Sequence, residues 1–192
     1  MNTPAHLVFA AAFAKPGAKR VTIAALIGGF LPDASLYLLA GWSIFIDGRS
    51  PSAVFGSDYF SPAWQAIFAI DNSVFVWGAV IAAGALLKRP WLLALGGAAL
   101  LHIAFDLPLH HDDGRAHFWP ITTWVFESPI SYWDNNHHAG IVAPLEALAV
   151  AGLSVILWRR FKGAWSRAGI ALLAMAELAP AIVWGLMFSG HH

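Results

Sequence analysis

Long apolar stretches alternate with short polar ones along most of this chain. Five apolar windows are each long enough, at about 1.5 Å per helical residue, to cross a hydrocarbon core of roughly 30 Å. They are Val21–Ile46, Pro62–Leu87, Trp91–Leu109, Ala139–Trp158 and Ala168–Phe188. A shorter apolar stretch, Pro4–Ala14, indicates a half-helix that enters the bilayer and returns. The pattern therefore predicts an all-α integral membrane protein, a bundle of about five transmembrane helices plus a short N-terminal half-helix.

The connections between these windows are of two kinds. Three are short and basic, and two are long: the short ones are Lys15–Arg20, Lys88–Pro90 and Arg159–Arg167, and the long ones are Asp47–Ser61 and His110–His138. The long connections hold two of the eleven basic residues, Arg49 and Arg115, and the short ones hold the other nine. Because basic residues favour the cytoplasmic side, we expect a multi-pass protein of a bacterial inner membrane with both long loops in the periplasm.

Composition supports this interpretation and narrows the chemistry. The chain is 58% hydrophobic and 11% charged, with a mean hydropathy of +0.63, and its 192 residues leave room for one polytopic membrane domain spanning 1–192. The formal charge is zero, which gives no indication of a nucleic-acid partner. There is no cysteine, so a transition-metal site must use imidazole and carboxylate ligands, which suit zinc, manganese or iron.

Several side chains within the predicted spans are costly to place in lipid. Besides His102 they are acidic: Asp33, Asp71, Asp106, Glu146 and Glu177. Each acid near a span centre costs about 2.5–3.5 kcal/mol on insertion scales. Because every lysine and arginine falls in a turn, loop or span end, we expect no ion pair to offset this cost. Protonation, a hydrated cavity, hydrogen bonding or a shared metal cation remains. For Glu177 a local hydrogen bond and membership of a cluster are equally open.

The second span carries a signal for an irregular helix. Gly28, Gly29 and Pro32 immediately precede Asp33, and proline removes a helical hydrogen bond. We therefore expect the helix to break there and to free backbone groups that line a cavity. His6 in the half-helix reaches a comparable depth.

The densest chemistry follows the third span. His102, Asp106 and His110 are spaced four apart, and a four-residue step keeps two side chains on one helix face. With His111, Asp112, Asp113 and His117 they make seven histidines and aspartates in sixteen positions. This concentration favours a metal site over isolated interfacial histidines. Three residues that end the loop either complete this site or are simply solvated: Asp134, His137 and His138. The terminal pair His191 and His192 is assigned no role.

The order of these motifs resembles that of the YdjM-type family of small membrane-bound metal-dependent hydrolases. The resemblance rests on His6 in the apolar N-terminus, on Leu31-Pro32-Asp33, and on His102-x-x-x-Asp106 leading to a His-rich loop and Trp119-Pro120. It covers about the first 120 residues and implies a bacterial inner-membrane hydrolase whose metal site resembles that of zinc-dependent phospholipase C. The chain departs from the family at Asp71-Asn72-Ser73, where relatives carry a His-containing stretch. A ligand is therefore replaced there, by Asp71 or by His110 and His117, or the activity is lost.

Taken together, these features favour a metal-dependent hydrolase of a phosphoester or another polar, lipid-proximal substrate. The proposed ligands of one or two divalent ions, zinc first, are His6, Asp33, His102, Asp106, His110 and His117. Asp113 or Asp71 is the candidate general base, and Arg115 the candidate phosphate contact. The alternatives are a non-catalytic subunit or assembly factor of a membrane complex, with a structural ion or a proton relay, and a transporter, which at this length would need a homo-oligomer.

Overall fold

The computed structural model describes residues 1–14 and 16–188 and is all-helical over that part of the chain. Lys15 in the first basic turn, together with His191 and His192, lies outside the described residues. The elements are α1 (Thr3–Phe13), α2 (Lys19–Phe45), α3 (Pro51–Ala53), the π-helical turn η1 (Val54–Asp58), α4 (Pro62–Asp71), α5 (Val74–Leu86), α6 (Pro90–Asp106), the 3₁₀ turn η2 (Asn135–His137), α7 (Ala139–Arg160) and α8 (Ala164–Phe188).

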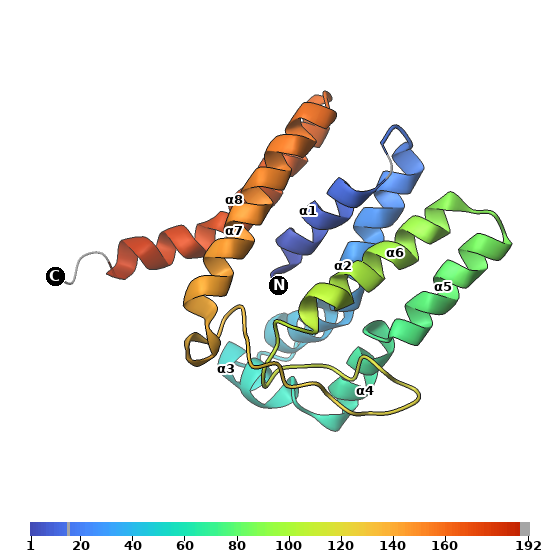
Figure 1. Ribbon diagram of the computed structural model, residues 1–192. Helices are drawn as coiled ribbons and strands as arrows, with labels where there is room; N and C mark the ends of the chain where they lie inside the picture. The colour runs from blue at the N-terminus through green and yellow to red at the C-terminus, as the bar shows by residue number, and fades with distance from the viewer. Residues whose placement is uncertain (15, 189–192) are drawn as a thin grey trace.

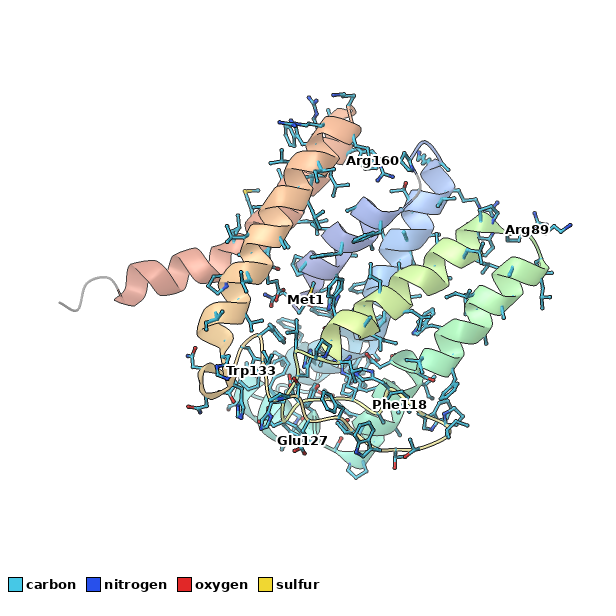
Figure 2. The ribbon with its side chains drawn as sticks, viewed as in Figure 1. Met1, Arg89, Phe118, Glu127, Trp133 and Arg160 are labelled. Atoms are coloured by element: carbon cyan, nitrogen blue, oxygen red, sulfur yellow. The ribbon has the colours of Figure 1, made fainter. Side chains whose placement is uncertain are left out.

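The short and long connections gather at opposite ends of the bundle. Arg89 and Arg160 mark the end with the short basic turns, and Phe118, Glu127 and Trp133 mark the end with the long loops (Figure 2). Helices α2, α5 and α6 run side by side, and α1 packs against α2 on one side and against α7 and α8 on the other (Figure 1). The two-ended arrangement expected from the basic residues is thus present.

Within the described part of the chain, three segments are long and apolar enough to cross a membrane: α2, the α4–α5 unit over Pro62–Leu86, and α7. Helix α6 has 17 residues, which at about 1.5 Å each falls short of a ~30 Å hydrocarbon core. The last predicted window lies in α8, where the side chains beyond residue 179 are outside the described part. A helical membrane bundle therefore fits, whereas the five predicted spans are not confirmed. The predicted half-helix is α1, a helix of 11 residues.

The second apolar window was predicted as one span, and the structure divides it into the two helices α4 and α5. It is interrupted at Asn72 and Ser73, because both residues have polar partners that a straight helix would not give them. The Ser73 hydroxyl caps α5 by accepting from the Phe75 and Val76 amides at 3.2 Å, and the Val74 amide donates to the His117 carbonyl at 2.9 Å. This interruption docks the long loop against the bundle.

The predicted break at Pro32 is wrong, because α2 continues through it. Proline disturbs the helical hydrogen bonds around it, yet neighbouring carbonyls find side-chain donors. The Gly29 carbonyl accepts from His102 Nδ1 at 2.9 Å, and the Pro32 carbonyl accepts from Asn72 Nδ2 and Arg115 at 3.0 Å each. The helix does not unwind, and these bonds fix three polar side chains around Asp33.

The glycine of α2 that faces α6 allows very close packing. A Cβ atom on Gly28 would lie 2.0 Å from the Leu95 carbonyl oxygen. The α2–α6 contact is the most extensive helix pairing among the described residues, and it brings Asp33 beside His102.

Candidate metal centre

Three buried side chains from three helices meet in the interior of the bundle. His6 comes from α1, Asp33 from α2 and His102 from α6, and one potential ligand atom from each lies within 4.8 Å of the other two. The three residues are 2%, 7% and 1% exposed. All three were predicted as ligands from the sequence, and the structure brings them together.

Asp106 joins the two histidines. Its Oδ1 atom lies 2.9 Å from His6 Nε2, and its Oδ2 atom lies 3.0 Å from His102 Nε2. The two imidazole rings are stacked, with centroids 3.5 Å apart and planes at 10°. The His102–Asp106 contact confirms that the four-residue spacing places both side chains on one face of α6.

The orientation of both imidazole rings suits a cation. The Nδ1 atom of His102 can donate its proton to the Gly29 carbonyl, which leaves Nε2, 3.0 Å from Asp106 Oδ2, as the nitrogen with a lone pair for a cation. His6 is arranged the other way round, with Nε2 on Asp106 and Nδ1 buried without a partner. Metal-binding histidines generally donate the other ring N–H to a carboxylate or a carbonyl in this manner. Two nitrogens and one carboxylate are a donor set that zinc accepts.

The expectation that no cation pairs with these acids is wrong. The Met1 ammonium lies 2.7 Å from Asp106 Oδ1, and one guanidinium nitrogen of Arg115 lies 3.5 Å from Asp33 Oδ1. Arg115 belongs to a predicted loop, but that loop folds back into the bundle and leaves the residue 6% exposed. Burial by itself disfavours the charged guanidinium, but Tyr59 and Asp33 outweigh burial and raise the pKa of Arg115.

His110 and Asp113 extend the cluster towards the long loop. His110 Nε2 lies 3.5 Å from Asp106 Oδ1, and His110 Nδ1 lies 2.8 Å from Asp113 Oδ2. Trp133 Nε1 donates to the same Asp113 oxygen at 3.0 Å, while Asp113 Oδ1 is buried without a partner. Two further predicted site residues therefore lie next to the centre.

The structure does not bring Asp71 and His117 into the three-residue group. Asp71 ends α4 half-buried, and its backbone carbonyl accepts from Trp77 Nε1 at 2.6 Å. His117 is buried with its Nδ1 atom 3.1 Å from the Asn72 carbonyl, and burial lowers its pKa. His117 therefore helps to dock the loop, whereas the Asp71 carbonyl joins the end of α4 to α5. The role of Asp71 as general base is not supported by its position, because it is not among the residues that line the cavity described below.

The remaining buried acids and the end of the loop have other partners. Asn2 donates from its backbone nitrogen to Glu146 at 2.7 Å and from its side-chain Nδ2 to Glu177 at 3.1 Å. Glu177 is thus hydrogen-bonded to the residue that precedes α1, 175 positions away in the sequence. His137 pairs with Asp134 at 2.6 Å and stacks on His111 at 3.6 Å.

A cavity of about 440 Å³ opens beside the centre. One part of its lining is ionisable and the other aromatic: the first consists of Asp33, Asp106, His110, Asp112, Asp113 and Arg115, and the second of Tyr37, Phe55, Tyr59, Phe60, Tyr132 and Trp133. Burial raises the pKa of Tyr59 and of Tyr132, so both phenols stay protonated at neutral pH. The cavity connects buried candidate ligands with partly exposed aromatic side chains.

Two polar residues of this region were missed from the sequence. The Thr3 hydroxyl donates to Asp33 Oδ2 at 2.6 Å, and the Tyr37 hydroxyl donates to Thr3 Oγ1 at 2.9 Å. Tyr37 follows Asp33 by four residues on α2, so the spacing rule used for His102 and Asp106 would have found it. Nothing local marks Thr3.

The His110–Asp113 pair predicts a pH-dependent stability in chelator-treated protein. Burial lowers the pKa of His110, but Asp106 and Asp113 outweigh burial and raise it above the usual 6.5. Burial likewise opposes ionisation of Asp113, yet His110 and Trp133 lower its pKa below the usual 3.8. The raised pKa of His110 stabilises the fold below pH 6.5, and this contribution is lost as the pH rises through the pKa of the folded state. The lowered pKa of Asp113 stabilises the fold above pH 3.8, and this contribution is lost as the pH falls through the pKa of the folded state.

Asp113→Asn should therefore lower the melting temperature of metal-free protein more at about pH 5.5 than at about pH 9. Thermal unfolding in detergent at the two values measures this difference. An equal effect at both would show that the charged pair does not contribute.

No family model, curated protein or solved structure matches this chain.

Proposed function

We propose that this protein is a membrane-bound, metal-dependent hydrolase that acts on a phosphoester. The observation that carries the proposal is the buried His6–Asp33–His102 group, with one ligand atom from each residue within 4.8 Å, beside a cavity of about 440 Å³. Zinc is the proposed ion because its sites in proteins use these ligand types, which manganese and iron also accept. The proposed location is a bacterial inner membrane, with the long loops and the cavity on the periplasmic side.

His6, Asp33 and His102 would hold the ion, with Asp106 orienting the imidazole of His6 and the Gly29 carbonyl orienting that of His102. A bound divalent ion would supply Lewis acidity towards the phosphoryl oxygen and would ease deprotonation of water. His110 lies next to Asp106 and is the proposed further ligand, or the group that positions Asp113. His117 is left with a structural role.

Hydrolysis forms a bond from the oxygen of water to phosphorus and breaks a P–O ester bond, and the proton of the water ends on the leaving alkoxide. Asp113 is the proposed proton acceptor, because its Oδ1 atom is buried without a partner and its Oδ2 atom is held by His110 and Trp133. Arg115 lines the cavity, and its Nε–H is buried without a partner, so it is the proposed donor to the phosphate.

Elemental analysis of detergent-purified protein, combined with a panel of chromogenic phosphomonoesters and phosphodiesters, tests the proposal. We expect about one or two metal ions per chain and hydrolysis that stops on chelation and returns when zinc is added. Asp113→Asn should retain the metal and lower kcat by about 10²–10⁴-fold, the contribution typical of a general base. If the folded protein still contains no metal after incubation with zinc, manganese and iron, the proposal is refuted.

One observation favours a non-catalytic membrane subunit. The Met1 ammonium and two histidines already surround Asp106, which relieves part of its burial cost without a metal. A subunit of this kind would co-purify with a larger complex and would hydrolyse no ester on the panel.

A further inference from the structure

The outer part of the cavity is aromatic and half-exposed. Tyr37, Phe55, Phe60 and Trp133 line it and are 52%, 51%, 49% and 53% exposed. Trp133 lies at the end of the bundle that carries the long loops (Figure 2). Amphipathic and aromatic side chains of this kind collect where a bilayer meets water.

One side of this mouth continues into an exposed apolar face of α2, a helix long and apolar enough to cross a membrane. Leu38, Trp42 and Phe45 recur at helical spacing on α2 and are 61–83% exposed. In a spanning helix such a face contacts acyl chains. Tyr37 precedes Leu38, and η1, which carries Phe55, packs against α2. The mouth therefore opens at the edge of the lipid-facing surface and not only towards water.

A hydrogen-bonded chain runs from this mouth to a candidate ligand. Tyr37 donates to Thr3, and Thr3 donates to Asp33. Arg115, on the inner wall, presents a cationic donor to the same cavity. One molecule would thus place its apolar part against the aromatic side chains of the cavity and its anionic group beside Arg115.

We propose, on the basis of the proposed function, that the substrate is a phospholipid that enters from the bilayer. Its phosphate would lie between the metal centre and Arg115, and its glycerol and first acyl carbons would lie against Tyr37, Phe55 and Phe60. A cavity of about 440 Å³ receives the polar headgroup and leaves the chains in the membrane. Water adds to phosphorus, one P–O ester bond breaks, and the proton passes to the alcohol that leaves.

The test compares a phospholipid in mixed micelles with a water-soluble chromogenic phosphodiester, using zinc-loaded protein. In the Phe55→Ala/Phe60→Ala double variant, kcat/KM for the lipid should fall about tenfold relative to kcat/KM for the soluble ester, because aromatic contacts with the apolar part are lost. Phe75→Ala is the matched control, because Phe75 on α5 is 46% exposed and is not among the residues lining the cavity. It should leave the ratio unchanged.

The outcomes separate this inference from the proposed function. If the soluble ester is hydrolysed and the lipid is not, or if the double variant leaves the ratio unchanged, lipid entry is refuted and the hydrolase stands. If neither substrate is hydrolysed by metal-loaded protein, the proposed function fails and lipid entry falls with it. Retention of the lipid preference in Phe75→Ala and its loss in the double variant support entry past Phe55 and Phe60.

Discussion

His102→Ala is expected to remove metal from the purified protein while the helices remain folded. His102 supplies one of the two imidazoles of the group, and its loss leaves one imidazole and one carboxylate. The loss of affinity should exceed the roughly 10- to 100-fold seen when only a partner that orients a ligand is removed. Metal content by elemental analysis and helix content by circular dichroism give the two readings.

The control for this prediction is His111→Ala. His111 is half-buried, stacks on His137 and bonds to the Ser128 carbonyl, so it should retain full metal content. Asp33→Asn provides a second variant of nearly unchanged shape, in case the cavity left by His102→Ala prevents folding. A folded His102→Ala or Asp33→Asn protein with wild-type metal content would contradict the site.

The candidate ligands could be predicted because the solvation argument and the spacing agree. A carboxylate and a histidine in an apolar span have few tolerable environments, and a step of four residues places His102 and Asp106 on one face. His6 and Asp33 could be placed at similar depth by counting from the ends of the spans. The structure confirms that His6, Asp33 and His102 converge.

The cations that approach these acids could not be predicted in this way. Arg115 is distant in sequence from Asp33 and lies in a polar loop, so a count along the chain gives it to water. It is buried because the loop is held at several backbone positions: the Val74 amide donates to the His117 carbonyl, and the Ser128 amide donates to the His110 carbonyl. Such contacts depend on tertiary structure, and hydropathy does not record them.

Two features of helix continuity were not anticipated from the sequence. Pro32 was expected to break α2, but the helix continues, with His102, Asn72 and Arg115 donating to the nearby Gly29 and Pro32 carbonyls. The apolar window beginning at Pro62 was predicted as one span, and capping by Ser73 divides it into α4 and α5. In both places side chains hydrogen-bond to the backbone where the helix is irregular. Near Pro32 one of these side chains is the candidate ligand His102.

Gly28→Ala is expected to destabilise the bundle and weaken metal binding together. The added Cβ would lie 2.0 Å from the Leu95 carbonyl oxygen and 2.8 Å from its carbon, and both atoms are backbone that no side-chain rotation can move. Helices α2 and α6 must separate, at a cost of at least about 1–3 kcal/mol for overpacking. That separation also draws Asp33 away from His102, so the melting temperature and the zinc affinity should both fall.

Gly41→Ala on the same helix should have the opposite sign. A Cβ at Gly41 meets nothing within 4 Å, and alanine is favoured over glycine inside a helix by roughly 0.5–1 kcal/mol. The melting temperature should therefore rise slightly or stay constant, with zinc affinity unchanged. Thermal unfolding in detergent and zinc titration of the two variants measure these effects. If Gly28→Ala matched Gly41→Ala in both measurements, close packing of α2 on α6 would not be what positions Asp33 and His102.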